Sequence, residues 1–247
     1  MSNMKNSIFT IKENMSLTAN VFRMVLDGDC SDLTRPGQFV NIKIDGLFLR
    51  RPISVCDLNG DELTLIYKVV GNGTAKMSEM IPGETLDLLT GLGNGYDTSL
   101  SGDRPGLLGG GVGVPPLYLL ARRLISEGKH PFVILGFNTA DEIFYEQEFK
   151  DLGALTAVTT VDGSYGFKGF ATDAMPEEYS YVYCCGPEPM LKSVFRQTAT
   201  SGQFSFEERM GCGFGACMGC SCKTITGFKR ICKEGPVLRK EEILWEE

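Results

Sequence analysis

Five of the nine cysteines are crowded near the C-terminus, and this density suits metal ligation. Cys212, Cys217 and Cys220 follow the spacing C-x4-C-x2-C, and Cys222 and Cys232 come after them. That spacing is typical of loops that wrap thiolates around two irons in plant-type [2Fe–2S] sites, where interleaved glycines let backbone N–H groups reach the sulfurs. The segment therefore predicts a [2Fe–2S] cluster, and we take Cys212, Cys217, Cys220 and Cys232 as its ligands.

Two alternatives stay open at these cysteines. Five thiols compete for four places, and we expect Cys222 to point away from Cys220 and to be left out. A zinc site would usually show paired C-x2-C knuckles, so the four-residue gap between Cys212 and Cys217 argues against zinc. The odd cysteine count and the lack of an export signal argue against disulfides. Four cysteines elsewhere are expected to be packing residues: Cys30, Cys56, Cys184 and Cys185.

A second group of residues could hold a phosphate-containing cofactor. A strand ending in an Arg-Pro-x-Ser pattern is followed by another strand and then by a glycine-containing helix start. An arginine can bind a pyrophosphate through two hydrogen bonds, and the first turn of a helix offers free N–H donors. Taken alone, such a pattern is more often structural. The residues concerned are Arg51, Pro52, Ile53 and Ser54, then Ile66, Tyr67 and Lys68, then Gly73 and Thr74.

Two loops rich in glycine and proline indicate a nucleotide site. The stretch GGGVGVPP follows an apolar strand and opens a helix, as a dinucleotide loop requires, although G-x-G-x-x-G is absent and a tight turn without a ligand is the alternative. A second loop, CGPEPM, follows the last apolar strand, at the sheet edge where ligands gather. Asp141 and Glu142 follow a third strand and favour NADH over its phosphorylated form. The two loops contribute Gly110, Gly111, Gly113, Val114 and Pro115, and Cys185, Gly186 and Pro187.

The elements that position these residues fall into three segments, a β-barrel, an α/β sheet and a cysteine segment. Short runs rich in β-branched and aromatic residues predict a small antiparallel barrel in residues 1–98. Apolar strands alternating with helices predict an open parallel sheet with helices on its faces in residues 99–205. Residues 206–247 are too short and too rich in glycine and cysteine to bury their own core, so we expect a bound cluster to hold them.

Composition excludes several classes of function. The 247 residues carry a net charge of −7 that is spread along the chain, so there is no basic surface for nucleic acid. No apolar run approaches the roughly 20 residues needed to cross a bilayer, and no export signal is visible, so we expect a cytoplasmic protein without membrane contact. The single histidine, His130, lies beside Pro131 and is expected to be structural, which leaves no catalytic histidine.

In combination these motifs resemble a known family. RPIS, GNGT, GGGVGVPP, CGPEPM and ERMGCGFGACMGC occur in the order found in the ferredoxin-reductase superfamily. More narrowly, the whole chain is similar to the electron-transfer subunits of type B dihydroorotate dehydrogenases. The resemblance implies FAD on the barrel motifs and NADH on the Gly/Pro loops. It also implies that Ile53 occupies the place where the wider superfamily often has an aromatic residue stacked on the flavin.

The resemblance further implies a direction of electron flow. Electrons would pass from NADH through FAD and the [2Fe–2S] cluster to the FMN of a catalytic dihydroorotate dehydrogenase partner, in a heterotetramer of two of each subunit that serves pyrimidine (UMP) synthesis. An NADH-oxidising subunit of this kind is not expected to oxidise dihydroorotate alone. One alternative is a reductase subunit that supplies ferredoxin, a hydrogenase or a sulfite reductase. Another is a zinc-stabilised interaction protein with a vestigial nucleotide fold.

Overall fold

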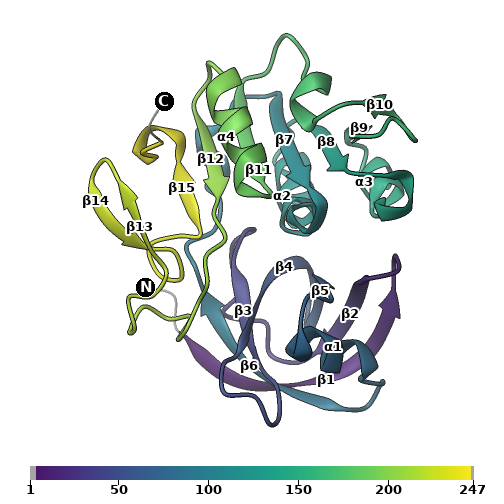
Figure 1. The fold of residues 1–247 in the computed structure, drawn as a ribbon, viewed down its shortest axis with the longest axis vertical. Coiled ribbons are helices and arrows are strands. Elements are labelled where there is room, and N and C mark those ends of the chain that lie inside the picture. The colour runs from purple at the N-terminus through teal and green to yellow at the C-terminus, as the bar shows by residue number, and fades with distance from the viewer. Residues whose placement is uncertain (1–3, 246–247) are drawn as a thin grey trace.

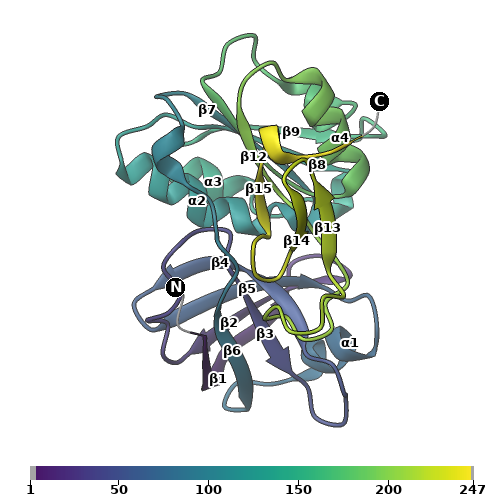
Figure 2. The same ribbon diagram turned by 90° about the vertical axis from the view of Figure 1, so that its left-hand side faces the viewer.

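Two β-sheet domains lie one above the other, and the C-terminal segment runs along one side of both (Figure 1, Figure 2). The computed structural model of the chain describes residues 4–245. The lower domain is a barrel and the upper one an α/β sheet, as the sequence predicts. No helix within residues 4–245 is long and apolar enough to cross a membrane.

The lower domain is a closed antiparallel barrel with the strand order β1-β2-β5-β4-β3-β6. Side chains alternate along β1 between the inside and the outside of the barrel. Phe9 and Ile11 are buried, whereas Ile8, directly before Phe9, is 61% exposed. The short helix α1 (Asn72–Glu79) adds Met77 to the same core. The barrel strands are β1 (Lys5–Ser16), β2 (Val21–Asp27), β3 (Phe39–Lys43), β4 (Arg51–Asn59), β5 (Glu62–Lys68) and β6 (Thr85–Leu92).

The upper domain is a seven-stranded sheet with the order β10-β9-β8-β7-β11-β12-β15. All neighbouring pairs are parallel except β12 with β15. Its strands are β7 (Pro105–Gly110), β8 (Phe132–Phe137), β9 (Leu155–Thr160), β10 (Phe167–Lys168), β11 (Tyr181–Cys185), β12 (Gly202–Ser205) and β15 (Val237–Arg239). Its helices are α2 (Pro115–Ser126), α3 (Glu146–Asp151) and α4 (Glu188–Gln197).

Helix packing in this domain follows the predicted apolar face in α2 and departs from it in α3. In α2 the side chains of Leu117, Leu120 and Leu124 are fully buried, as their spacing predicts. The sequence predicts one helix over 141–153, but the structure has a 3₁₀ turn followed by the shorter α3. Tyr145 lies between them with a φ of 67°, in the left-handed region that interrupts an α-helix. The 3₁₀ turn before α3 is Ala140–Glu142, and the others are Thr98–Leu100, Gly111–Gly113, Ala171–Ala174 and Lys240–Glu242.

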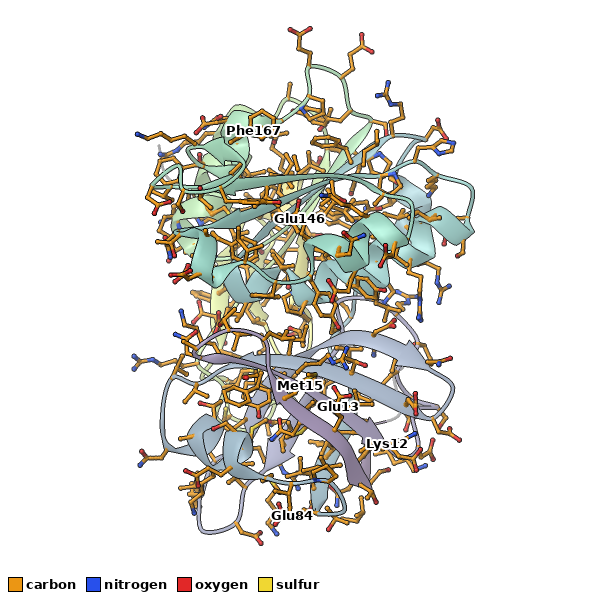
Figure 3. The ribbon with its side chains drawn as sticks, turned by 90° about the vertical axis from the view of Figure 1, so that its right-hand side faces the viewer. Lys12, Glu13, Met15, Glu84, Glu146 and Phe167 are labelled. Carbon is orange, nitrogen blue, oxygen red and sulfur yellow. The ribbon has the colours of Figure 1, made fainter. Side chains whose placement is uncertain are left out.

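The outer edge of the upper sheet carries exposed aromatic side chains. Strand β10 has only two residues, and Phe167 on it is 60% exposed. Figure 3 shows Phe167 and Glu146 on the upper domain, and Lys12, Glu13 and Met15 on β1 of the barrel.

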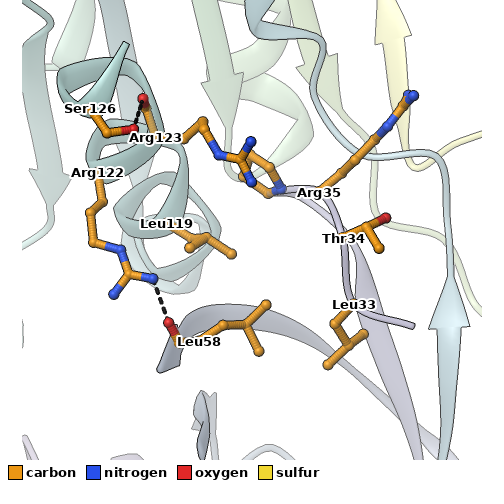
Figure 4. A pocket seen from close by; sticks show the side chains of 9 residues that line it. Leu33, Thr34, Arg35, Leu58, Leu119, Arg122, Arg123 and Ser126 are labelled. Atoms are coloured by element: carbon orange, nitrogen blue, oxygen red, sulfur yellow. Dashed lines mark hydrogen bonds between the residues drawn. The ribbon is translucent and has the colours of Figure 1, made fainter. Parts of the chain in front are cut away.

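The two domains meet where α2 lies across β4. Arg122 of α2 forms an ion pair with Asp57 of β4 at 2.8 Å and donates a hydrogen bond to the carbonyl oxygen of Leu58. A cavity of about 420 Å³ opens beside this ion pair, with Leu33, Leu58 and Leu119 among its lining residues (Figure 4). An ion pair and apolar contacts therefore join the barrel to the helix that follows β7.

The C-terminal segment is anchored on the upper sheet. Strand β15 pairs antiparallel with β12, so the last strand of the sheet comes from this segment. Strands β13 (Ser221–Thr224) and β14 (Gly227–Arg230) form a hairpin beside it. Trp245 packs against Phe195 and Phe206 with ring centroids 5.1 and 5.5 Å away. Strand pairing and aromatic packing thus fix a segment that is too short to form a core.

Asn94, in the linker between the domains, is tied to the same segment. Its Nδ2 donates to the carbonyl oxygens of Glu234 and Val237 at 3.1 and 2.7 Å, and its Oδ1 accepts from the N–H of Val237 at 3.1 Å. Its own N–H donates to the carbonyl oxygen of Gly235 at 2.7 Å. One side chain therefore connects the linker to the C-terminal segment at three points.

We expect N94A to loosen the C-terminal segment. The substitution leaves several main-chain groups without partners, which should lower the free energy of unfolding by about 1–3 kcal/mol. Trp245 is the single tryptophan, so its fluorescence during urea titration reports on this segment. The control N59A removes an exposed asparagine at the end of β4 and should change the free energy by less than about 0.5 kcal/mol. Equal midpoints for the two variants would contradict the role assigned to Asn94.

Candidate cofactor sites

The first two cysteines of the C-terminal segment lie in a loop whose N–H groups point at sulfur. The Sγ of Cys212 accepts from the N–H groups of Ala216 and Cys217 at 3.2 and 3.4 Å. The N–H of Gly219 lies 3.5 Å from the Sγ of Cys217. A Cβ on Gly211 would lie only 3.2 Å from that same sulfur, so the absence of a side chain there gives the thiol room. This loop has the N–H donors that iron–sulfur sites use.

The next two predicted ligands are brought together from opposite ends of the β13–β14 hairpin. Cys220 and Cys232 are each 2% exposed, and their sulfur atoms are 3.2 Å apart. The N–H of Cys232 donates to the Sγ of Cys220 at 3.4 Å, and the N–H of Ile231 donates to the carbonyl oxygen of Cys220 at 3.1 Å. The hairpin therefore places two thiols side by side although eleven residues separate them in the chain.

Cys222 lies outside both pairs. It is half-buried, and the hydrogen bond of its thiol goes to the carbonyl oxygen of Lys223 at 3.7 Å and not to a cysteine. Within residues 4–245, no group of three or more His, Cys, Asp or Glu side chains converges as a metal site would need. Cys212 and Cys217 share one loop, and Cys220 and Cys232 lie side by side, so the four predicted ligands stand as two pairs, as a two-iron cluster would use them.

The thiols differ in how readily they ionise. Burial acts to raise the pKa of Cys212, but the N–H groups of Cys217, Phe214 and Ala216 and the Cys217 thiol lower it to about 6. Burial raises the pKa of Cys232 to about 12. Cys212 is therefore already stabilised as a thiolate, whereas Cys232 must lose its proton when metal binds.

The barrel residues of the predicted flavin site surround the start of α1. The Arg51 guanidinium lies against Gly73, where a Cβ would collide with it. The Thr74 hydroxyl accepts from the N–H groups of Val70 and Gly71 at 3.0 and 3.3 Å, which fixes the turn before the helix. A cation beside free N–H groups of a helix start is the combination that binds phosphate.

Two main-chain edges beside this turn have no strand partner among residues 4–245. Arg51–Ser54 pair with β3, and Ile66–Lys68 pair with β2. Strands β4 and β5 pair with each other only between Val55–Asn59 and Glu62–Leu65. The strands therefore diverge toward α1 and leave donors and acceptors of both free on their facing edges. Such edges can hydrogen-bond a bound cofactor, so they are where the flavin ring system would fit.

The structure changes what two of the predicted flavin residues can contribute. Arg51 begins β4, whereas the sequence pattern suggests the end of a strand. Tyr67 is 2% exposed and its hydroxyl donates to Oδ1 of Asn14 at 3.0 Å inside the barrel, so only its main chain can reach a ligand. Lys68 and the side chains of Pro52, Ile53 and Ser54 are half-buried at the open edge.

The two Gly/Pro loops of the upper domain are in direct contact. Strand β11 is paired with β7, so Cys185 lies opposite Gly109. A Cβ on Gly113 would collide with the carbonyl oxygen of Cys185, and one on Gly110 would lie 3.1 Å from the ring of Pro187. The other predicted residues complete the first loop, since Gly111 has a φ of 51°, Val114 caps α2 and Pro115 is its first residue.

Of the two acidic residues predicted to favour NADH, one is hydrogen-bonded within the protein and the other is exposed to solvent. Glu142 accepts from the N–H and the Nδ2 of Asn138 at 3.1 and 2.8 Å, whereas Asp141 is exposed. Lys168, which is distant in sequence, packs its side chain against Gly163 at the same sheet edge. The preference for NADH therefore rests on Asp141 and stays a prediction.

Sequence reasoning missed Arg230, which supports the cysteine loop. Its Nη1 donates to the carbonyl oxygen of Gly215 at 2.7 Å, and its Nε donates to Glu234 at 2.9 Å. The four-residue spacing between Arg230 and Glu234 is the only sequence signal of this pair. The contact with Gly215 depends on how the hairpin folds and has no signal of its own.

Comparison with known proteins identifies the fold and the class of this chain. A family model described as "Oxidoreductase NAD-binding domain" matches residues 107–196. The solved structure of an NADH-dependent reduced ferredoxin-NADP oxidoreductase is similar with a TM-score of 0.86 and 31% identity, over 96% of this chain and 90% of that one. The FAD/NAD-binding domain of a Vibrio cholerae nitric oxide dioxygenase shares the fold, with a TM-score of 0.65 and 22% identity over 77% of this chain and 91% of that one. The fold and sites define an NAD-linked flavin reductase class with an added iron–sulfur segment.

Full-length relatives narrow this class. The family model "Iron-sulfur cluster binding domain of dihydroorotate dehydrogenase B" matches residues 207–244. The electron transfer subunit of dihydroorotate dehydrogenase B (NAD(+)) from Geobacillus sp. (strain WCH70) is 42% identical over 98% of this chain and 99% of that one. The corresponding subunit from Fusobacterium nucleatum is 42% identical over 97% and 99%. The chain belongs to the family of dihydroorotate dehydrogenase B electron transfer subunits, which confirms the predicted family and fold class.

Substitution of single cysteines should separate the ligands from Cys222. We expect C222S to keep about two irons per chain and C232S to lose most of its iron, because only the latter removes a paired thiol. Iron and sulfide analysis together with the visible absorption spectrum measure the difference. Iron retained in C232S and lost in C222S would reverse the assignment.

A matched pair of glycine variants should test the flavin cradle. G73A adds a Cβ where the Arg51 guanidinium lies and so displaces this cation from the helix start, and we therefore expect FAD to be lost on gel filtration. G71A alters the same turn, but Gly71 is extended and has open space around its Cβ position, so FAD should be retained. The flavin released by acid from each purified variant, measured by fluorescence, gives the FAD content. Equal FAD content in the two variants would place the flavin elsewhere.

Proposed function

We propose that this chain passes electrons from NADH, through FAD and a [2Fe–2S] cluster, to a catalytic dihydroorotate dehydrogenase subunit. The observation that carries the proposal is a segment with four cysteines, two in a loop of N–H donors and two with their sulfurs side by side, in a chain that matches electron transfer subunits along nearly its whole length. Bound together, flavin and cluster supply the conversion of a two-electron hydride donor into single electrons. The polypeptide need only bind and orient these groups.

Each set of predicted residues has a role in this proposal. Arg51 and the start of α1, with Gly73 and Thr74, would hold the FAD pyrophosphate, and the open edges of β4 and β5 would hold the rest of FAD. The loops around Gly113 and Gly186 would hold NADH. Cys212, Cys217, Cys220 and Cys232 would bind the cluster. No acid–base residue is required, because hydride and electron transfer depend on placement.

The finer parts of the assignment are proposals as well. We propose that the partner carries FMN, that two copies of each subunit assemble, and that the complex acts in the cytoplasm in pyrimidine synthesis. We also propose the division into a flavin domain (residues 1–98), a nucleotide domain (residues 99–205) and a cluster segment (residues 206–247), which follows from the sequence patterns. The names of the curated relatives support a catalytic partner, since each is called the electron transfer subunit of dihydroorotate dehydrogenase B.

One observation favours a second candidate acceptor. The solved structure at 31% identity belongs to an NADH-dependent reduced ferredoxin-NADP oxidoreductase, so ferredoxin is the second candidate acceptor. The higher identity of 42% to dihydroorotate dehydrogenase B subunits over nearly the full length makes that enzyme the first choice.

Reconstitution should decide between the acceptors. We expect the purified chain with NADH to reduce an artificial acceptor such as ferricyanide and to form no orotate from dihydroorotate. With a dihydroorotate dehydrogenase B catalytic subunit and NAD⁺ added, the same cofactors should carry electrons in the reverse direction, and orotate formation should become coupled to NAD⁺ reduction. Orotate absorbance and NADH absorbance follow the two half-reactions.

Two results would contradict this assignment. Orotate formed by the chain alone would mean that it contains the catalytic site itself. Rapid reduction of ferredoxin, with no coupling to the catalytic subunit, would favour the second candidate.

A further inference from the structure

We propose that Asn41 is a positioning residue that links the flavin strand to the cluster loop and so controls electron passage between the two cofactors. The inference rests on the proposed function and assigns a role to a side chain that carries no redox chemistry. Asn41 lies on β3 and is 1% exposed. A buried amide must have its hydrogen bonds supplied by specific partners, and the identity of those partners is what gives it a role.

On one side Asn41 is joined to the flavin motif. It pairs with Pro52 of β4, within the Arg51–Ser54 stretch. Because proline has no N–H, it cannot donate to Asn41, and the carbonyl oxygen of Asn41 accepts from Nη1 of Arg50 at 3.2 Å instead. The same nitrogen lies 2.8 Å from the carboxylate of Asp87. The main chain of Asn41 is therefore fixed by residues directly adjoining the proposed flavin site.

On the other side Asn41 is joined to the cluster loop. Its Nδ2 donates to the carbonyl oxygen of Cys212 at 3.1 Å, across 171 positions of sequence. The next residue, Gly213, has a φ of 78°, and a Cβ there would collide with this same Nδ2. The cysteine loop therefore packs closely against the Asn41 amide at Cys212 and Gly213. A hydrogen bond to the main chain of a metal ligand helps to fix the orientation of that ligand.

The oxygen of the Asn41 amide has no hydrogen-bond partner among the described residues. Since Nδ2 must face the Cys212 carbonyl, the orientation of the amide is fixed and Oδ1 points the other way. Oδ1 is buried and has no hydrogen-bond partner within residues 4–245. An unpaired buried acceptor is costly, so this atom is available to a donor on a bound group or a water. Asn41 therefore binds the cysteine loop through Nδ2, while its Oδ1 can accept a hydrogen bond from another group.

Loss of the amide should affect the cluster more than the flavin. In N41L, a side chain of similar size no longer holds the Cys212 carbonyl. We expect cluster reduction to slow about 10-fold relative to flavin reduction in stopped-flow experiments with NADH. Loss of the partly positive NH₂ group that binds the Cys212 carbonyl oxygen should also lower the midpoint potential of the bound cluster and alter its EPR signal.

A second variant approaches the same contact from the loop. G213A pushes the loop away from Asn41 and should reproduce the lower potential and the slower cluster reduction of N41L. G227A is its control, because Gly227 lies in the same segment with a φ of 117° but has nothing within 4 Å of its Cβ position. Any strain from a left-handed alanine is then present without the displacement from Asn41.

The outcomes separate this inference from the proposed function. A wild-type protein with FAD and cluster, and N41L and G213A variants with unchanged potential, EPR signal and cluster reduction, would overturn the inference alone. A wild-type protein without flavin or iron would overturn the proposed function and this inference with it. Similar shifts in G213A and G227A would show a strain effect and also overturn the inference.

Discussion

The pairing of β15 with β12 is the contact on which the arrangement of sites depends. The C-terminal segment has no core of its own, and this pairing makes it a part of the upper sheet. The Asn94 hydrogen bonds then tie the segment to the linker, and the Asn41 bond ties the cysteine loop to the barrel. Strand pairing and side-chain hydrogen bonds to main-chain groups hold three separate segments together, and the thiols are placed between them as a result.

Close main-chain approach recurs at each cofactor site. Gly73 lets an arginine lie on a helix start, Gly113 lets two loops touch, and Gly213 lets the cysteine loop press on an amide. In each case a methyl group would collide with an atom from a segment distant in the sequence. Glycines here serve to bring segments together, and only Gly213 of the three also requires a left-handed backbone.

Sequence patterns predict the local structure well because local structure depends on near neighbours. Runs rich in β-branched and aromatic residues identify the barrel strands, a 3.6-residue period identifies the buried face of α2, and cysteine spacing identifies the redox segment. The sequence does not show that Tyr145 interrupts a helix, because the cause is a left-handed residue held by packing. It also does not show that β15 joins the upper sheet or that Asn41 meets Cys212, because both contacts join positions far apart in the chain.

The edges of the upper sheet bear on how a partner subunit can attach. One edge strand, β10, has two residues, and the other, β15, has three. Edge strands this short offer few unpaired main-chain groups to a strand from another chain. Strand addition is therefore a poor route to a complex at this sheet. A stable complex with a partner subunit at this sheet has to depend on side-chain contacts, and the residues that make such contacts can change without altering the fold.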